Sequence, residues 1–382
     1  MEDNGLRIAL LVPGFSASET DWCIPFLRHL VTRLAKGDDV HVIALRYPYQ
    51  AGQYDLFGAQ VTALGGGTRQ GAGSVLLWRR AFSLLASEHR RRPFDVLHAF
   101  WANETGAVAA VAGRMLGIPT VVSLAGGELV GLRDIGYGGQ LAWTERTKVW
   151  LALRLASRVT AGSQYIISLA ERRLGGATAR LRRVPLGVDV EMFRPAAAAA
   201  PAAPPRLIQV ASLAPVKDQL TLLRSAALLR DGGLDFLLEI AGSGPMEPEL
   251  RGLAARLGLG DVVDFRGGVR HEALPGFYGG GAAFVQSSRH EAQGMAVLEA
   301  AACGVPAAGT RVGSVAEMEP EAAVAVPVGD AKALAEAVAG LIANPERRVE
   351  MGRAARGLAE GEYSLETCVE RFRKLYTELC QE

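Results

Sequence analysis

The sequence predicts an α/β protein of two domains, each built on a parallel sheet with crossover helices. At 382 residues the chain is long for one core, and 49% of its residues are hydrophobic, enough to bury two cores. Short apolar runs rich in β-branched residues alternate with helical stretches along the chain, which is typical of a parallel sheet. A stretch of alanine and proline, PAAAAAPAAPP at residues 195–205, divides these runs into two series.

The first series contains five predicted strands. They fall at residues 8–12, 40–45, 96–98, 120–124 and 159–162. The alanine and proline stretch that follows has no side chains that could specify a core, so we expect an interdomain linker there. The second series predicts five more strands, at residues 207–210, 237–241, 262–265, 283–286 and 306–309. We therefore expect a first domain over residues 1–195 and a second over residues 196–364.

The last stretch, residues 365–382, predicts an amphipathic helix. Its apolar residues recur at helical spacing, at Leu365, Val369, Phe372, Leu375, Tyr376 and Leu379. Such a stripe must pack on another part of the protein.

The cysteines and the first apolar run indicate in which cellular compartment the protein is expected. Cys23, Cys303, Cys368 and Cys380 are far apart and form no C-x-x-C pair, which indicates neither a disulfide framework nor a zinc site. The run at residues 8–12 is only strand-sized and fits neither a signal peptide nor a membrane span. No Asp-x-Asp or His/Cys cluster of ligand spacing appears, so no metal is expected. We expect a reduced, cytoplasmic protein.

Charge is divided unevenly along the chain. Residues 1–195 hold 23 Lys and Arg against 16 Asp and Glu, which leaves 18 against 24 for residues 196–382. A basic excess attracts anionic lipid or a phosphorylated acceptor, which would place the protein at the inner membrane surface. Solvated helix faces are the alternative. No nucleic-acid partner is expected.

The most informative segment is residues 288–306, SRHEAQGMAVLEAAACGVP, which follows a predicted strand and opens a helix at about Met295. Gly294 permits close backbone approach, and the free amides of Gly294, Met295 and Ala296 at a positive helix end can bind an anion. The layout fits a diphosphate in the middle, with sugar hydroxyls on Glu291 and ribose hydroxyls on Glu299. Local geometry alone leaves open that both are solvated helix carboxylates.

This Glu-x7-Glu pattern, followed by Ala-Cys-Gly-Val-Pro, resembles the donor motif of the retaining GT-B glycosyltransferases called group 1. The likeness continues in residues 184–195, in the lysine loop at residues 213–218, in the Gly-x-Gly-Pro turn at residues 240–245, and in the last helix. The resemblance implies a GT-B fold, in which two doubly wound Rossmann-like domains face each other across a cleft. It places the donor on the C-terminal side and the acceptor on the N-terminal side, and it implies that the last helix crosses back to the first domain.

The resemblance also assigns roles in the second domain. It implies that Lys217, near the start of a predicted helix, neutralises the donor diphosphate in place of a metal, although screening by Asp218 is the alternative. Gly242 and Gly244 form Gly-x-Gly after a strand and imply a donor contact; Glu247 breaks a full dinucleotide fingerprint and disfavours NAD. Val269 falls where the family holds the base through its backbone, and a plain turn is as good an interpretation.

In the first domain, Gly14 follows the first strand, where backbone can approach donor phosphates or acceptor, or form an ordinary turn. Residues 123–128, SLAGGE, resemble the family's His-Gly-x-Asp loop, which contacts the donor sugar: Ala125 stands in place of the histidine, Gly126 matches, and Glu128 stands for the aspartate. His98 ends a strand, and acceptor contact and a structural role are equally good interpretations.

Taken with the resemblance, the sequence predicts a retaining, metal-independent glycosyltransferase that moves a sugar from a nucleotide diphosphate donor to an unidentified acceptor, anionic or lipid-linked among the candidates. Glu291 would position the sugar, and Lys217 would stabilise the departing diphosphate; no further cofactor is expected. Ala125 and Ser212, which stands where many members carry arginine, motivate an alternative: an inactive nucleotide-sugar-binding protein. A nucleotide-sugar 2-epimerase of the same architecture is the other.

Overall fold

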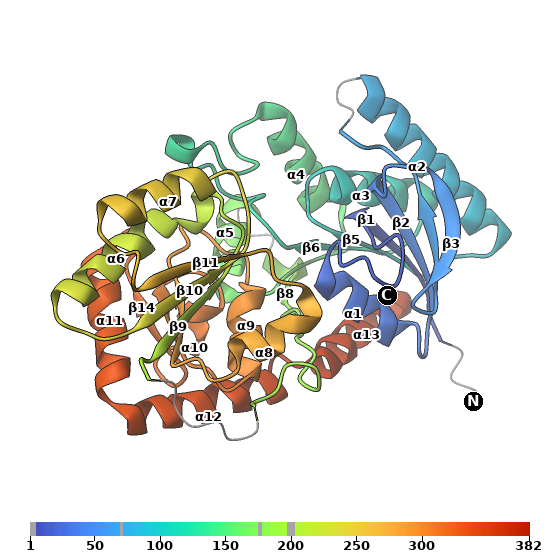
Figure 1. The fold of residues 1–382 in the computed structure, drawn as a ribbon. Coiled ribbons are helices and arrows are strands. Elements are labelled where there is room, and N and C mark those ends of the chain that lie inside the picture. The colour runs from blue at the N-terminus through green and yellow to red at the C-terminus, as the bar shows by residue number, and fades with distance from the viewer. Residues whose placement is uncertain (1–4, 69–71, 175–177, 197–202) are drawn as a thin grey trace. The chain divides into compact units, whose positions relative to one another are not determined.

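The computed structural model describes residues 5–68, 72–174, 178–196 and 203–382. The chain forms two compact units, one of residues 1–187 with 365–382 and the other of residues 188–364 (Figure 1). Both are sheets covered by helices, as the sequence predicts.

The first unit has an eight-stranded sheet in the order β3-β4-β2-β1-β5-β6-β7-β8. Its strands are β1 Arg7–Gly14, β2 Asp39–Tyr47, β3 Gly52–Leu56, β4 Ala59–Ala63, β5 Val96–Phe100, β6 Thr120–Leu124, β7 Arg158–Ala161 and β8 Leu181–Arg183. All neighbours pair in parallel except β3 with β4. The five predicted strands are present, and β3, β4 and β8 were missed.

The helices of the first unit are α1 Pro25–Leu34, α2 Ala72–Arg91, α3 Glu104–Leu116, α4 Trp143–Leu155, α5 Gln164–Leu174 and α13 Leu365–Gln381. Helix α13 contacts α1 and β5. Its buried side chains are those of Leu365, Cys368, Phe372, Leu375, Tyr376 and Leu379, so five of the six residues of the predicted stripe are buried. The apolar stripe therefore finds its partner in the first unit.

The second unit has a six-stranded parallel sheet in the order β11-β10-β9-β12-β13-β14. Its strands are β9 Arg206–Val210, β10 Leu237–Ala241, β11 Val263–Gly267, β12 Ala283–Gln286, β13 Ala307–Thr310 and β14 Ala323–Val326. Its helices are α6 Gln219–Asp231, α7 Glu247–Arg256, α8 Leu274–Tyr278, α9 Met295–Ala302, α10 Ser314–Met318, α11 Ala331–Ala343 and α12 Pro345–Gly361. This strand order is that of the Rossmann fold, with its crevice at the carboxyl ends of the first and fourth strands, here β9 and β12.

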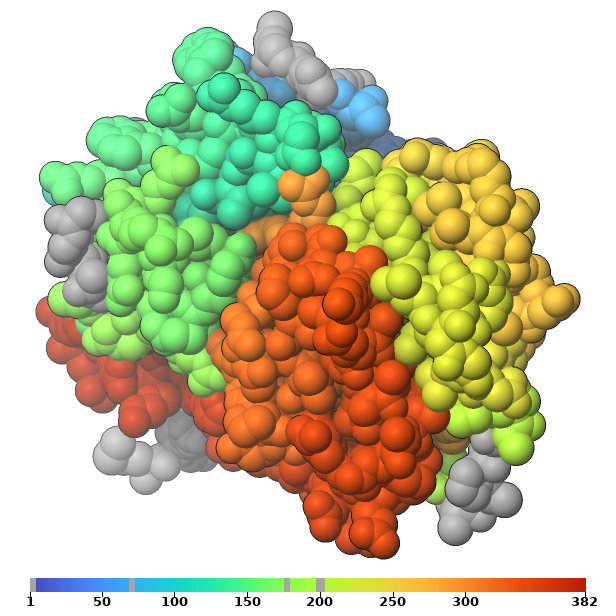
Figure 2. Space-filling model, turned by 90° about the vertical axis from the view of Figure 1, so that its left-hand side faces the viewer, coloured from blue at the N-terminus to red at the C-terminus, as the bar shows by residue number. Residues whose placement is uncertain are grey.

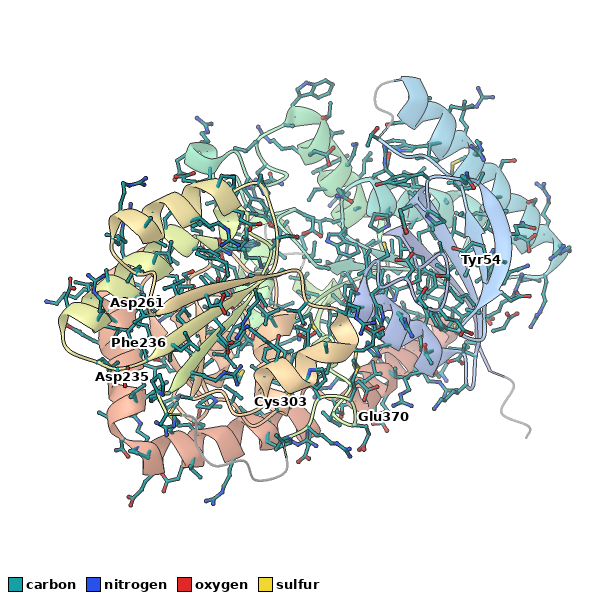
Figure 3. All side chains as sticks on the ribbon, in the orientation of Figure 1. Tyr54, Asp235, Phe236, Asp261, Cys303 and Glu370 are labelled. Atoms are coloured by element: carbon teal, nitrogen blue, oxygen red, sulfur yellow. The ribbon has the colours of Figure 1, made fainter. Side chains whose placement is uncertain are left out.

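Helices cover both faces of the second sheet. Leu207 and Ile208 are neighbours on β9, so their side chains point to opposite faces, and they belong to different buried clusters. One cluster contains residues of α9, α10 and α12, together with Cys303, which follows α9. The other contains residues of α6, α7 and α11, together with Phe236 (Figure 3). Figure 2 shows the outer surface that α6, α7 and α11 form, from yellow-green to orange-red.

The boundary between the units differs from the predicted one. The second unit begins at Val188, before the predicted position at residue 195. Val188 and Phe193 are 2% and 1% exposed and belong to the core of the second unit, so the chain has entered that unit before the alanine and proline stretch. The predicted linker lies largely outside the described residues.

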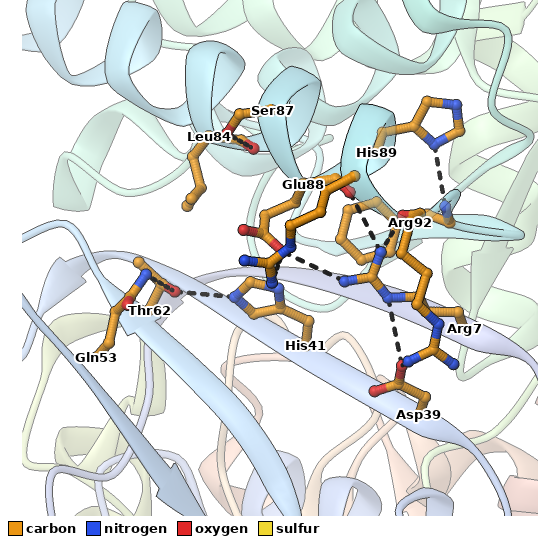
Figure 4. A network of polar contacts seen from close by, with 12 residues as sticks. Arg7, Asp39, His41, Gln53, Thr62, Leu84, Ser87, Glu88, His89 and Arg92 are labelled. Carbon is orange, nitrogen blue, oxygen red and sulfur yellow. Dashed lines mark hydrogen bonds and ion pairs between the residues drawn. The ribbon is translucent and has the colours of Figure 1, made fainter.

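A charged network fastens β1 to its neighbours in the first unit. Arg7, itself buried, pairs with Asp39 on β2 and with Glu88 on α2, each at 3.3 Å (Figure 4). Its guanidinium carbon lies 4.3 Å from the centre of the Phe94 ring. Through these three contacts, the Arg7 side chain links α2 to the sheet.

All four cysteines are free thiols. Among the described helices, none is both long and apolar enough to cross a bilayer. Within the same part of the chain, no three His, Cys, Asp or Glu side chains are grouped so that they could hold a metal ion.

Candidate functional site

A small cavity of about 190 Å³ lies in the second unit at the carboxyl ends of β9 and β12. The residues that line it include Lys217, Glu291, Gly294, Met295 and Ala296. Gly294 precedes α9 with φ of 93°, a left-handed conformation that favours glycine, and it turns the chain so that the helix begins at Met295. Five of the predicted donor residues thus meet around one helix N-terminus, although Lys217 and Glu291 are 74 positions apart in the sequence.

Lys217 and Glu291 form an ion pair in this cavity. The Lys217 Nζ lies 2.6 Å from Glu291 Oε1, and the Ser288 hydroxyl donates to the same oxygen at 2.6 Å. Lys217 ends a short 3₁₀ turn, and Asp218 caps α6 by accepting from the amide of Thr221. The partner of Lys217 is therefore Glu291, and Asp218 is engaged elsewhere.

Two glutamines in the cavity wall were not predicted. Gln209 on β9 and Gln286 on β12 are 2% and 5% exposed. Among the described residues, Gln209 Oε1 and Gln286 Nε2 have no hydrogen-bond partner. A buried amide that lacks a partner costs free energy unless a ligand or water supplies one, so these atoms are suited to ligand hydroxyls. A glutamine near the carboxyl end of each of two largely apolar strands is the signal that could have found them.

Glu299 lies deeper than the cavity. Its side chain is almost fully buried, and its Oε2 accepts a hydrogen bond from the Tyr278 hydroxyl at 2.8 Å. Burial raises the pKa of the Glu299 carboxyl to about 7, although the bond from Tyr278 opposes the shift. Glu299 is not among the residues that line the cavity. Glu299 is therefore not a solvated helix carboxylate. Nor does its side chain line the cavity in this structure.

The Gly-x-Gly turn and the lysine loop pack against each other. A Cβ on Gly242 would lie 1.8 Å from the carbonyl oxygen of Ala211, and one on Gly244 would lie 2.4 Å from that of Leu213. Gly242 also has φ of 142°. These glycines are therefore needed for the close approach of two backbone segments, whatever they contribute to a ligand.

Ser212 and Val269 are not among the residues that line the cavity. The Ser212 carbonyl accepts from the Gln219 side chain, and Val269 packs at the edge of a buried cluster.

His98 is a structural residue in this fold, which corrects its inclusion among the acceptor-side residues. It is fully buried, with Nδ1 2.6 Å from the Tyr376 hydroxyl and Nε2 2.7 Å from the Ser123 hydroxyl. Burial lowers the pKa of His98 to about 3, so the ring is neutral. Both nitrogens are occupied by side chains, and neither can reach an acceptor.

Glu128 has a structural role as well. Its buried carboxylate accepts from the amides of Ala102, Ala125 and Gly126, and burial raises its pKa. The side chain thus ties the loop after β6 to the loop after β5. Gly14 ends β1, where a Cβ would lie 3.0 Å from that of Tyr47, so the missing side chain permits close packing there.

Comparison with known proteins bears on both units. The model of the family described as Glycosyl transferases group 1 matches residues 193–358, and that of Glycosyltransferase Family 4 matches residues 26–192. The chain is 31% identical over 241 residues to a GDP-mannose-dependent alpha-(1-6)-phosphatidylinositol monomannoside mannosyltransferase of Mycolicibacterium smegmatis, covering 58% of this chain and 63% of the relative. It is 31% identical over 294 residues to a D-inositol 3-phosphate glycosyltransferase 2 of Catenulispora acidiphila, covering 71% of this chain and 68% of that relative.

Among solved structures, sucrose-phosphate synthase of Thermosynechococcus elongatus superposes with a TM-score of 0.79 at 20% identity, covering 98% of this chain and 99% of that one. Two Rossmann-like units of this kind define the GT-B class of fold, as predicted. The chain belongs to the group 1 glycosyltransferases. The alignment with the Mycolicibacterium relative spans a little under two thirds of that protein's length.

Proposed function

We propose that this protein is a retaining glycosyltransferase that moves a sugar from a nucleotide diphosphate donor without a metal ion. The observation that carries the proposal is the position of Lys217 beside the first amides of α9 in one cavity. Negative charge develops on the diphosphate as the sugar leaves, and a fixed ammonium with helix-end amides stabilises it. A donor phosphate oxygen would take the acceptor's proton, so no protein base is assigned.

Donor binding would exchange the ion pair between Lys217 and Glu291 for contacts with the donor. A diphosphate at the end of α9 offers Lys217 a more highly charged partner than one carboxylate. Glu291, released from the lysine, can accept hydrogen bonds from sugar hydroxyls and position the sugar. Gln209 and Gln286 would supply further contacts in the same cavity.

The first experiment identifies the nucleotide. Thermal unfolding of the whole protein is followed with GDP, UDP, ADP and dTDP, and the best ligand is taken to calorimetry. We expect one diphosphate to raise the unfolding temperature, because a ligand that binds only the folded state stabilises it. GDP is the first candidate, since the Mycolicibacterium relative is GDP-mannose-dependent by name. If none of the four shifts the transition, the donor proposal is wrong.

The second experiment tests which part of the donor each of the two glutamates binds. Glu299 lies behind the cavity wall in this structure, so it bonds the nucleotide only if donor binding exposes its carboxylate to the ribose. In that case a charge-assisted hydrogen bond worth about 1.5–3 kcal/mol is lost in Glu299→Gln, and the nucleotide dissociation constant rises roughly tenfold to a hundredfold; unchanged affinity would make Glu299 a core residue only. Glu291→Gln should leave nucleotide affinity intact and lower turnover with the full donor. Lys217→Ala should weaken nucleotide binding, whereas Lys332→Ala, an exposed lysine of α11, should not. Nucleotide affinity lost in Glu291→Gln and kept in Glu299→Gln would reverse the assignment.

Activity in EDTA tests metal independence. We expect unchanged initial rates, because Lys217 and the helix end can carry the charge that a metal would otherwise carry. Loss of activity in EDTA and its recovery with manganese would contradict this.

An inactive sugar-nucleotide-binding protein is the second candidate, favoured by Ala125 and Ser212, which depart from the family pattern. Donor hydrolysis by the pure protein separates the two, since a binding protein would release no sugar. The same assay, analysed for an epimerised donor, tests the 2-epimerase alternative.

For the acceptor we propose an inositol-bearing molecule, because the names of both relatives contain inositol.

We also propose that the first unit, which carries most of the basic excess, contacts an anionic membrane surface from the cytoplasmic side. Helix α4 exposes Trp143 and Trp150 at 76% and 60%, and they line a groove of about 740 Å³ with Arg146, Arg154 and Arg173. Figure 2 shows the green segment that contains α4 and α5 at the surface. Exposed indoles beside arginines suit the interface between headgroups and acyl chains.

A further inference from the structure

Two buried hydroxyl groups support the ion pair between Lys217 and Glu291 from outside the cavity. Ser287 follows β12 and Thr310 ends β13, and the two residues are 0% and 1% exposed. Neither is among the residues that line the cavity. Hydroxyl groups buried so deeply do not meet a ligand in this structure, so their role follows from the groups to which they donate.

The Ser287 hydroxyl holds the backbone of Lys217. It donates to the Lys217 carbonyl at 2.8 Å. Because a carbonyl can only accept, the hydroxyl proton is used there, and the contact of 3.4 Å with Gln209 must be a donation from the Gln209 Nε2. Asp218, the next residue after Lys217, has φ of 46°, a left-handed conformation that persists only where its surroundings hold it. The direction in which the lysine leaves its loop therefore depends on Ser287.

The Thr310 hydroxyl supports Glu291 through Ser288. It donates to the Ser288 carbonyl at 2.6 Å, and the Ser288 hydroxyl in turn donates to Glu291 Oε1 at 2.6 Å. Thr310 thus fixes the backbone of the residue that holds the glutamate.

A backbone hydrogen bond joins the two loops without either hydroxyl. The Arg289 amide donates to the Val216 carbonyl at 2.8 Å. Loss of one hydroxyl should therefore leave the loops together and change only the position of the side chain that it supports. Positioning can be separated from folding for this reason.

We propose that Ser287 and Thr310 are positioning residues of the cavity, Ser287 for the ammonium of Lys217 and Thr310 for the carboxylate of Glu291. This inference rests on the proposed function, in which Lys217 binds the donor diphosphate and Glu291 binds the sugar. Charges that are held in place before the reaction stabilise a departing diphosphate best, because they need no reordering when the sugar leaves. A lysine side chain has many conformations, and a fixed backbone leaves fewer of them to be ordered by the ligand.

Calorimetry tests the role of Ser287, with whichever of GDP, UDP, ADP and dTDP the wild type binds most tightly. We expect Ser287→Ala to raise the dissociation constant about three- to tenfold. In a Lys217→Ala background the same substitution should change the constant by less than about twofold, since Ser287 acts through the lysine. Ser225→Ala is the matched control and should bind as the wild type does. The Ser225 hydroxyl is also buried and donates to a backbone carbonyl at 2.8 Å, that of Leu222 within α6.

Three results would overturn the role of Ser287: unchanged affinity in Ser287→Ala, an equal loss in Ser225→Ala, or an undiminished loss in the Lys217→Ala background. Should Ser287→Ala fail to fold, Ser287→Cys decides, because a thiol is only a weak donor; wild-type affinity in that variant overturns the role. If Lys217→Ala itself binds the nucleotide as tightly as the wild type, the proposed donor site is wrong and the positioning role falls with it.

Thr310→Val tests the second hydroxyl. Valine keeps the β-branched shape of threonine, so β13 should form as before. We expect nucleotide affinity within about twofold of wild type, and turnover with the full donor lower by at least about threefold, because only the sugar-binding glutamate is displaced. Unchanged turnover, or a loss of nucleotide affinity equal to that of Ser287→Ala, overturns the role of Thr310. Turnover that is absent from the wild type as well would overturn the proposed function, and the role of Thr310 with it.

Discussion

The carboxyl group of Glu299 lies on the buried side of α9, where its Oε2 accepts a hydrogen bond from the hydroxyl of Tyr278. A carboxylate in such a place is disfavoured relative to the neutral acid, because burial removes it from water. With a pKa of about 7, Glu299 holds its proton at pH values where an exposed glutamate is ionised. The residue is therefore a titratable group built into the core of the second unit.

Stability should fall with rising pH because of Glu299. Between the usual pKa of about 4.5 and the folded value of about 7, the folded protein keeps a proton that the unfolded chain releases. The free energy of unfolding therefore decreases across this window and levels off above it, by on the order of 3 kcal/mol in total. Glu299→Gln cannot titrate, so the wild type should lose stability relative to this variant from pH 5 to pH 8, as measured by urea unfolding.

Tyr278→Phe provides the companion measurement. It removes the hydrogen bond that favours the charged carboxylate and so raises the folded pKa further; the fall in stability should begin at the same pH and extend to higher pH. Curves of wild type and Glu299→Gln that run parallel from pH 5 to pH 8 would show that Glu299 titrates normally.

At this scale the sequence predicted the members of the donor cavity better than their contacts. Glu291, Gly294, Met295 and Ala296 are close in sequence and follow one strand, so local reasoning places them together. Lys217 joined them only through the family resemblance. Gln209 and Gln286 were missed because a polar residue in a strand does not show which face, or which end of the sheet, it occupies.

At the scale of elements, a buried hydrogen bond links α13 to β5. The Tyr376 hydroxyl of α13 bonds His98 of β5 in a fully buried site. Tyr376→Phe leaves the histidine nitrogen without this partner, so we expect a loss of about 1–3 kcal/mol in the free energy of unfolding. Thr377→Val on the same helix is the control, because its exposed hydroxyl donates to the Arg373 carbonyl of its own helix. Equal effects of the two substitutions would show that the buried bond contributes nothing.

The loops at the ends of β9 and β10 depend on Gly242. Alanine there would place its Cβ 1.8 Å from the Ala211 carbonyl oxygen, at φ of 142°. We expect Gly242→Ala to lower stability by more than about 4 kcal/mol, or to prevent folding of the second unit. Gly340→Ala is the opposite case, since Gly340 lies inside α11 with nothing within 4 Å of its Cβ position. Gly340→Ala should raise the free energy of unfolding, measured by thermal unfolding, by about 0.5–1 kcal/mol. If Gly242→Ala left stability unchanged, the two loops would be able to separate.

Strand prediction succeeded where strands are apolar and central. β1, β5 and β6 are buried almost throughout, and their β-branched runs are visible in the sequence. β3 is an exposed edge strand and β8 has only three residues, two of them arginine, so neither has a hydrophobic pattern. The unit boundary was misplaced for a related reason. Val188 and Phe193 are buried in the second core, but the composition of the sequence around them does not show which core they join.

At the scale of the whole molecule, charge is segregated along the chain. The half up to residue 195 has a net charge of +7 and the remainder −6, from the counts of Lys and Arg against Asp and Glu. The two units can therefore meet charged partners of opposite sign. Screening by salt acts over about 8–10 Å at physiological ionic strength, so any attraction of this kind must weaken as salt is added.

The first unit should bind vesicles that contain anionic lipid. Sedimentation of the whole protein with vesicles of phosphatidylcholine, with and without phosphatidylglycerol, should bring it down only with the anionic lipid, and less so at high salt, because arginines near a charged surface each contribute about 1 kcal/mol. Replacing Trp143 and Trp150 of α4 by serine should reduce the bound fraction further, since both indoles are exposed and available to enter the interface. Leu228→Ser, which removes an exposed apolar side chain from the second unit, should leave binding unchanged.

Equal recovery in the supernatant with both kinds of vesicle would rule out the membrane contact and leave the basic excess to an anionic acceptor. Binding that the tryptophan substitutions do not alter would move the contact away from α4.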